Sequence, residues 1–137
     1  MLRQTYFAQL DNVPNGPWLV DVTRKAPWFL RRDQRERLER KPELAPSTDL
    51  LSDFMDAKAA LKRDGVPDTR AHNQAFEAVH YRERFVSQIR QDDDALRTLS
   101  HLAKRSADRD AYLVCYCAAD KACHRHLLIE LAETMWA

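Results

Sequence analysis

Glycine is scarce in this sequence, and Gly16 and Gly65 are the only two among its 137 residues. Loops that wrap the phosphates of a nucleotide use several closely spaced glycines, because only a residue without a side chain lets the backbone approach so closely. The two glycines here lie far apart in the chain. The sequence therefore excludes a glycine-rich nucleotide loop, and any bound phosphate must be held in another way.

Long apolar runs and an excess of charge of one sign are also missing. No segment reaches the roughly 18 apolar residues of a membrane-spanning helix, and the amino terminus lacks the apolar core of a signal peptide. The 22 basic and 21 acidic residues give a formal net charge of +1, so the chain as a whole has no strong attraction to nucleic acid or to a membrane surface. We therefore expect a soluble, cytoplasmic protein without a membrane partner.

Cysteine is rare as well, and its three copies all lie between Cys115 and Cys123. An odd and clustered set of cysteines is a poor disulfide framework for a secreted domain and suits a reducing compartment. Cys115 and Cys117 would share one face of a strand, where a disulfide between them would be distorted. The pattern fits a cytoplasmic protein whose thiols stay reduced.

The regular segments predict the fold class. A chain of this length forms one domain, here 1–137, because it can bury roughly two-thirds of its unfolded surface in a single core. Apolar, β-favouring runs predict strands at 18–23 and 111–117, with a weaker candidate at 3–10. Strands separated by helices predict an α/β domain with a small, mainly parallel sheet flanked by helices, and the uncharged final strand should be central.

Helical spacing of apolar residues predicts the helices between these strands. The predicted helices run from Ser47 or Thr48 to about Gly65, from Phe76 to Ile89, and from Asp92 to Ala103. Ser47 or Thr48 and the aspartates after Gln91 are suitable N-caps. The polar segment 64–72 is expected to be a loop, and 33–40 has the composition of a helix without an apolar stripe.

The clearest candidate site lies in the final stretch, 111–136. Its strand gives way to a helix that starts near Cys123, so Cys123, His124 and Arg125 fall at the junction. The N-terminus of a helix has free N–H groups and a positive dipole end, and both favour an anion. We therefore expect a pocket for a small anionic ligand at this junction.

This closing motif, LVCYC followed by CHRHLLIELA, resembles that of the domain-of-unknown-function 488 (DUF488) family, in which a strand ending in Leu-Cys-Tyr-Glu precedes Cys-His-Arg and a helix. Further segments match in the same order: TYFAQL at 5–10, LVDVTRKAPWF at 19–29, ELAPSTDLL at 43–51 and YRERF at 81–85. The resemblance covers nearly the whole chain and implies a fold and a candidate site, but no reaction. Cys117 stands where many relatives have a glutamate, so no role of that carboxylate carries over.

The first functional hypothesis is a thiol-based active site. A cysteine beside His124 and Arg125 would have its thiolate favoured, and the thiolate is the nucleophile. We assign Cys123 to thiol chemistry, His124 to proton transfer or to orienting a neighbour, and Arg125 to an anionic group held by two parallel hydrogen bonds. The residues leave open whether the site is catalytic.

Position along the chain adds further ligand-binding candidates. The strand at 18–23 delivers Asp21, Thr23 and Arg24 to the carboxyl end of the sheet, where open α/β proteins bind ligands. Asp21 could instead pair with Arg125 as a structural ion pair. Further candidates for the pocket walls are Tyr6, Tyr81 and Arg82.

A structural zinc site is the second hypothesis. Cys115, Cys117, Cys123 and His126 are thiolate and imidazole ligands of the kind that zinc prefers. Their C-x-C spacing, however, departs from the two to four residues that usually separate paired cysteines in zinc sites. We therefore expect no cofactor, with zinc as the alternative.

An adaptor or nucleic-acid-binding protein is the third hypothesis. The segment from Arg24 to Lys41 holds eight basic and three acidic residues, with Trp28 and Phe29 among them. Basic side chains neutralise phosphates and aromatic rings stack on unpaired bases. A charged run is more often a solvated surface, and the sequence identifies neither a partner for this segment nor an oligomeric state.

Overall fold

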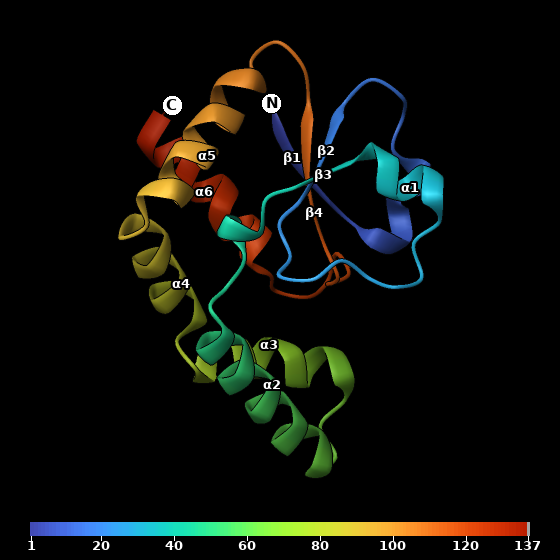
Figure 1. Ribbon diagram of the computed structural model, residues 1–137. Coiled ribbons are helices and arrows are strands. Elements are labelled where there is room, and N and C mark those ends of the chain that lie inside the picture. Colours follow the sequence, from blue (N-terminus) through green and yellow to red (C-terminus); the bar gives the residue numbers. More distant parts are fainter. Residues whose placement is uncertain (137) are drawn as a thin grey trace.

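The computed structural model describes residues 1–136 and is built on a four-stranded sheet with the strand order β1-β4-β2-β3 (Figure 1). The strands are β1 (Leu2–Tyr6), β2 (Trp18–Asp21), β3 (Leu38–Arg40) and β4 (Ala111–Cys115). Every strand pairing is parallel. The predicted α/β class is therefore confirmed, and the final strand is central as expected.

The position of each strand follows from its burial. β4 lies between β1 and β2, and Ala111, Leu113, Val114 and Cys115 are all buried, as expected for a parallel strand covered on both faces. β3 was not predicted, because its three residues follow a run of helical composition. That run divides into a short helix, α1 (Arg32–Arg37), and an edge strand that pairs with β2 alone.

The helices connect and cover the sheet. They are the 3-10 helices η1 (Phe7–Asn12) and η2 (Pro42–Leu44) and the α-helices α2 (Thr48–Arg63), α3 (Asp68–Ala78), α4 (Tyr81–Arg90), α5 (Asp93–Arg105) and α6 (His124–Trp136). Ser47 caps α2 by accepting the N–H of Leu50, and Asp92 caps α5. Both caps were predicted. Within residues 1–136 no helix combines the length and apolarity needed to cross a membrane.

Two predictions about the middle of the chain are wrong. The segment 64–72 is not all loop, since α3 begins at Asp68 directly after Pro67. α3 buries only Ala71, His72 and Ala75, so its polar composition resembles that of a loop. The helix predicted from 76 to 89 is two helices, because the chain turns between α3 and α4.

His80 makes this turn in the left-handed conformation, with φ of 56°. A β-branched residue is strongly disfavoured there, because its Cβ substituents collide with the backbone. We expect His80→Val to lower the free energy of unfolding by about 1–2 kcal/mol, whereas His80→Gly should not destabilise the protein. Urea denaturation of both variants tests this, and equal stability of the two would contradict the role of the turn.

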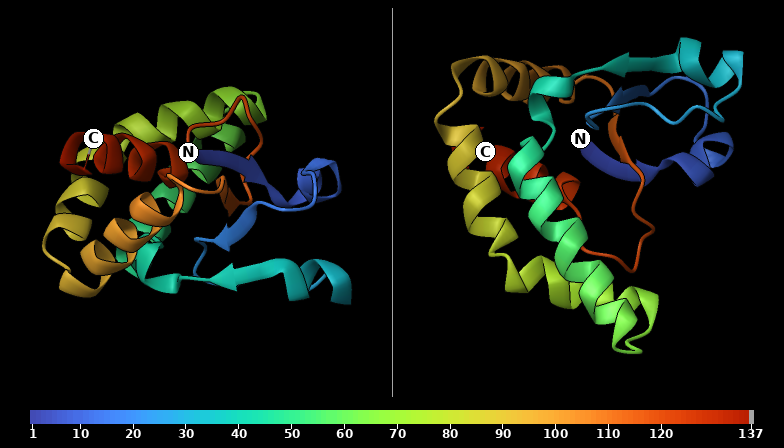
Figure 2. Two further views of the ribbon diagram at one scale, coloured as in Figure 1. Left: turned by 90° about the horizontal axis from the view of Figure 1, so that it is seen from above. Right: turned by 60° about the horizontal axis from the view of Figure 1, so that its bottom comes forward.

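The sheet has a large and a small apolar layer. Val20 and Leu113 point to one face, where they join the core formed with α2 and α4–α6. Leu19 and Val114 point to the other face and pack with Phe7 and other residues of η1 and the following segments. The views in Figure 2 show the α4–α6 side and the η1 side separated by the strands. The α2–α3 hairpin extends beyond the ends of the strands (Figure 1), where it can form the wall of a site.

Candidate functional site

A cavity of about 580 Å³ lies where β2 and β4 end. The segment after β2 forms one side of it, and the end of β4 forms another. Helices α2, α3 and the first residue of α4 supply the facing wall, and the start of α6 closes the cavity. The cavity thus combines segments that lie up to about a hundred residues apart in sequence.

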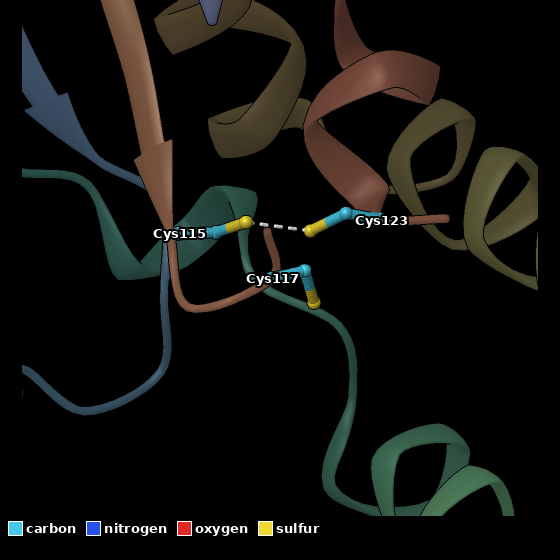
Figure 3. A group of neighbouring side chains, drawn as sticks. All are labelled: Cys115, Cys117 and Cys123. Carbon is cyan, nitrogen blue, oxygen red and sulfur yellow. Dashed lines mark hydrogen bonds between the residues drawn. The ribbon is translucent and has the colours of Figure 1, made fainter. Parts of the chain in front are cut away.

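All three cysteines line this cavity, and their sulfurs lie within 4.8 Å of one another. The Sγ atoms of Cys115 and Cys123 are 2.7 Å apart and point toward each other, with Cys117 beside them (Figure 3). This separation is longer than the about 2.05 Å of a disulfide bond, and all three thiols are free. The strand-to-helix junction therefore holds a preformed pair of thiols.

Arg125 does not line the cavity and is only 1% exposed. Its Nη1 donates to the sulfur of Cys115 and to the carbonyl oxygen of Cys117, the latter at 2.6 Å. The remaining donors reach the side-chain oxygen of Gln4 at 3.0 Å and the carbonyl of Ala118 at 3.3 Å. Arg125 was predicted to hold a ligand, but these contacts direct its guanidinium to the protein's own atoms and to one thiol.

These contacts separate the three thiols by acidity. Burial alone would raise the pKa of Cys115, but hydrogen bonds from Cys117 and Cys123 and the charge of Arg125 outweigh it and lower the pKa below its usual value. Hydrogen bonding to Cys115 raises the pKa of Cys117 to about 12. Burial and hydrogen bonding to the other two thiols raise the pKa of Cys123. The contact with Arg125 and the direction of these shifts favour Cys115 as the thiolate of the cluster, with its neighbours as the thiols that donate to it.

His124 is placed to accept a proton from the second thiol. Its Nε2 lies 2.8 Å from the carbonyl oxygen of Val22, which only accepts, so Nε2 carries the proton. Nδ1 is then an acceptor, 3.4 Å from Sγ of Cys123. Burial lowers the pKa of His124, which keeps the ring neutral and Nδ1 available. The predicted role of His124 as a base thus has a specific partner, Cys123.

The candidates that follow β2 have separate roles. Asp21 is fully buried but does not line the cavity; its carboxylate accepts from Thr23 Oγ1 at 2.5 Å and from Arg40 Nε at 3.1 Å. Its ion-pair partner is thus Arg40, where the sequence suggested Arg125. Thr23 and Arg24 do line the cavity, and Arg24 is held by the carbonyl oxygen of Pro46 at 2.9 and 2.8 Å.

The other candidates divide between the cavity and the surface. Tyr81 lines the cavity, and burial raises its pKa. Tyr6 pairs with Cys115 in the sheet but lies outside the cavity. Arg82 is half exposed and pairs with Glu130, and His126 lies in a separate surface depression with Arg82. The structure therefore does not bring His126 into the cysteine cluster.

Sequence reasoning missed several residues of the site. The sequence suggested Cys115 only as an alternative zinc ligand, because its contact with Arg125 crosses from the strand to the helix. Lys58, His72 and Lys121 line the cavity but carry no local signal of it. His72 donates from Nε2 to the carbonyl of Ala122 at 2.6 Å, a contact across 50 residues that no short-range pattern reveals.

The basic segment 24–41 engages most of its arginines within the protein. Arg35 donates to the carbonyls of Pro27, Trp28 and Leu30, and Arg31 pairs with Asp11 and Asp33. Further pairs are Arg32 with Glu36, Arg37 with the carbonyl of Pro14, and Arg40 with Asp21. Trp28 is 88% exposed. Arginines already paired in this way have less charge to offer to phosphates, which favours the cavity over this segment as the functional site.

The lowered pKa of Cys115 has a direct consequence for its reactivity. A thiol with an ordinary pKa near 8.5 loses about 100-fold in alkylation rate between pH 8 and pH 6, because the thiolate fraction falls in proportion. Cys115 should retain its thiolate and its rate over this range. Peptide-resolved mass spectrometry after brief iodoacetamide treatment measures each cysteine, with the urea-unfolded chain as the control. If the alkylation rate of Cys115 falls between pH 8 and pH 6 as steeply as in the unfolded chain, its pKa is not lowered.

Comparison with known proteins identifies one related family. A family model described as the active DUF488-N3 subclade matches residues 4–135. A search of curated proteins and a search of solved structures gave no match. The matched range includes every residue of the cysteine cluster and every residue that lines the cavity.

Proposed function

The chain belongs to the DUF488 family, and from this premise we propose that its cysteine cluster is the active site of a dithiol oxidoreductase that reduces small disulfides. One observation carries the proposal. Two free thiols lie 2.7 Å apart at the base of a cavity, with a guanidinium on the sulfur of Cys115 and a neutral imidazole beside that of Cys123. The description of the matching family model as an active subclade supports an enzymatic site.

The first step is attack on the substrate by Cys115. Its thiolate attacks one sulfur of a disulfide R–S–S–R that occupies the cavity, so that a new S–S bond forms between Cys115 and R–S. The substrate S–S bond breaks, and its electron pair leaves with the other R–S⁻, which takes a proton from water. Arg125 stabilises the attacking thiolate before the step, because its Nη1 donates directly to that sulfur.

The second step releases the other half of the substrate. Cys123 loses its proton to Nδ1 of His124, and the resulting thiolate attacks the sulfur of Cys115. A bond forms between Cys115 and Cys123, the mixed disulfide breaks, and the second R–S⁻ leaves with the proton from His124. The substrate gains two electrons and two protons in total, and the protein disulfide is later reduced by an external dithiol.

The decisive experiment is oxidation of the reduced protein by hydroxyethyl disulfide. We expect a loss of two hydrogens in intact mass, and peptide mapping should place the new disulfide between Cys115 and Cys123. Two equivalents of mercaptoethanol should be released for each protein molecule. Formation of stable mixed disulfides on separate cysteines, without an internal disulfide, would overturn the proposal.

Zinc binding is a second candidate, because three sulfurs within 4.8 Å of one another could hold a soft metal ion. The contact of Arg125 with Cys115 argues against it, since a fixed guanidinium beside the cluster would repel a dication. Elemental analysis of protein purified without chelator distinguishes the two. One equivalent of zinc, together with loss of thiol reactivity, would favour the metal site.

A further inference from the structure

The wall of the cavity opposite the thiols is aromatic. Phe54, His72, Phe76 and Tyr81 contact one another there, and the rings of Phe76 and Tyr81 are stacked with centroids 4.3 Å apart. Leu51, from the same helix as Phe54, adds an aliphatic surface. Rings and aliphatic side chains of this kind favour a planar, apolar group, which can lie against them in offset or edge-to-face geometry.

Apart from the thiolate of Cys115, the charged residues of the cavity are all basic. Arg24 and Lys25 lie on the side formed by the segment after β2, and Lys58 and Lys121 lie toward the α2–α3 hairpin. None of the described residues that line the cavity is acidic. An anionic group on a ligand would therefore meet positive charge without meeting a carboxylate.

The basic charge at the hairpin is not neutralised by its neighbours. Lys58, Lys62 and Lys121 approach the same carboxylate of Asp68, at 3.5, 2.9 and 2.7 Å. Three ammonium groups share one negative charge, so this end of the cavity keeps an excess of positive charge. His72 does not add to that charge, because burial lowers its pKa, and it contributes an aromatic ring instead.

From these observations we infer that the substrate is an aromatic disulfide that carries an anionic group on its ring, such as a carboxylate. The ring would lie against Phe76 and Tyr81, the anion would face Lys58 and Lys121, and the sulfur would reach Cys115. This inference rests on the proposed dithiol function, and it adds the substrate class. Burial raises the pKa of Tyr81, so its hydroxyl keeps its proton and can donate it to such a ligand.

The test compares four disulfides in a two-by-two design: dithiobis(nitrobenzoate), which is aromatic and anionic; dithiodipyridine, aromatic and neutral; dithiodipropionate, aliphatic and anionic; and hydroxyethyl disulfide, aliphatic and neutral. Leaving-group acidity changes the intrinsic rates, so each rate is divided by that of free mercaptoethanol thiolate with the same disulfide. We expect the normalised rate to be highest for dithiobis(nitrobenzoate), by about tenfold over either single-feature compound. Equal normalised rates for all four would overturn the substrate class.

Variants separate the two features of the ligand. Lys58→Gln should lower the normalised rate with dithiobis(nitrobenzoate) by about threefold to tenfold more than the rate with dithiodipyridine. Lys104→Gln is the matched control, because Lys104 is exposed on α5 and does not line the cavity. Equal sensitivity of both disulfides to Lys58→Gln would contradict the role of its charge.

A binding measurement keeps this inference separate from the proposed function. In Cys115→Ser, which lacks the attacking thiol, nitrobenzoate should still bind with a Kd of about 1 mM or below, and nitrobenzene and propionate should bind more weakly. Chemical-shift changes of the Tyr81 and Phe76 rings report binding in the cavity. If the wild-type protein forms its internal disulfide but nitrobenzoate does not bind, the substrate class is wrong and the dithiol function stands. If nitrobenzoate binds and no disulfide forms, the function is wrong and the ligand class stands.

Discussion

Replacing Arg125 by methionine is expected to lower the free energy of unfolding by about 3–5 kcal/mol, the usual cost of removing one partner from a buried charged network. Arg125 is 1% exposed, and its loss leaves the carbonyl oxygens of Cys117 and Ala118 without this donor and removes one of the donors to the thiolate of Cys115. Each buried acceptor left unpaired adds to the cost. Guanidinium chloride denaturation followed by circular dichroism gives the difference directly.

The matched control is Arg84→Met. Arg84 pairs with Asp53 through a half-exposed side chain, so its loss should cost about 0–1 kcal/mol. Arg125→Lys is a second variant for the case in which the methionine protein does not fold, since a lysine keeps the charge but not the forked geometry. In this variant Cys115 should still alkylate faster at pH 6 than the cysteines of the unfolded chain. A stable Arg125→Met protein with an unchanged Cys115 rate would show that Arg125 neither supports the fold nor activates the thiol.

The second large effect concerns the order of the two thiols. Cys115→Ser should lower the rate of exchange with hydroxyethyl disulfide by at least about 100-fold at pH 7, because it removes the sulfur that Arg125 contacts and leaves Cys123, whose pKa is raised by burial. Cys123→Ser should react at Cys115 and stop there, leaving one mixed disulfide for each protein molecule. Intact mass before and after reduction measures both results.

With the same disulfide substrate, we therefore expect a stable mixed disulfide in Cys123→Ser and little reaction in Cys115→Ser. Each substitution removes a single sulfur and keeps a side chain of similar size, so thermal melting should show both proteins folded before they are compared. If Cys115→Ser exchanges at the wild-type rate while Cys123→Ser is inert, the nucleophile is Cys123, as the sequence alone suggested. If Cys123→Ser still forms an internal disulfide, Cys117 resolves the mixed disulfide instead.

Cys117 gives this chain an arrangement that differs from the family pattern with which its sequence was compared. The closing motif that this sequence resembles has a glutamate here, and a carboxylate beside the Cys115 thiolate would repel it. A thiol with its pKa raised to about 12 stays neutral and can donate its proton to the neighbouring sulfur. Cys117→Glu should therefore slow exchange at neutral pH, because it replaces a donor by a second negative charge.

The amino-acid sequence by itself determined the elements whose signals are local. The apolar run of β4 and its lack of charge predicted a central strand, and the capping residues Ser47 and Asp92 fixed the starts of α2 and α5. The change from strand to helix near Cys123 was also visible, because caps and helical periodicity arise between residues a few positions apart. Where the local signal was weak, as in the polar helix α3, the prediction failed.

Only the tertiary structure decided which thiol Arg125 contacts and which residues face it. Arg125 turns to Cys115 and Gln4, across ten and 121 residues, when β1, β4 and α6 pack together. The wall that holds Lys58 and Phe76 reaches the cysteines only because α2 and α3 fold back over the ends of β2 and β4. Contacts between residues so far apart in sequence depend on how helices and strands pack together. Short-range patterns in a single sequence do not predict that packing.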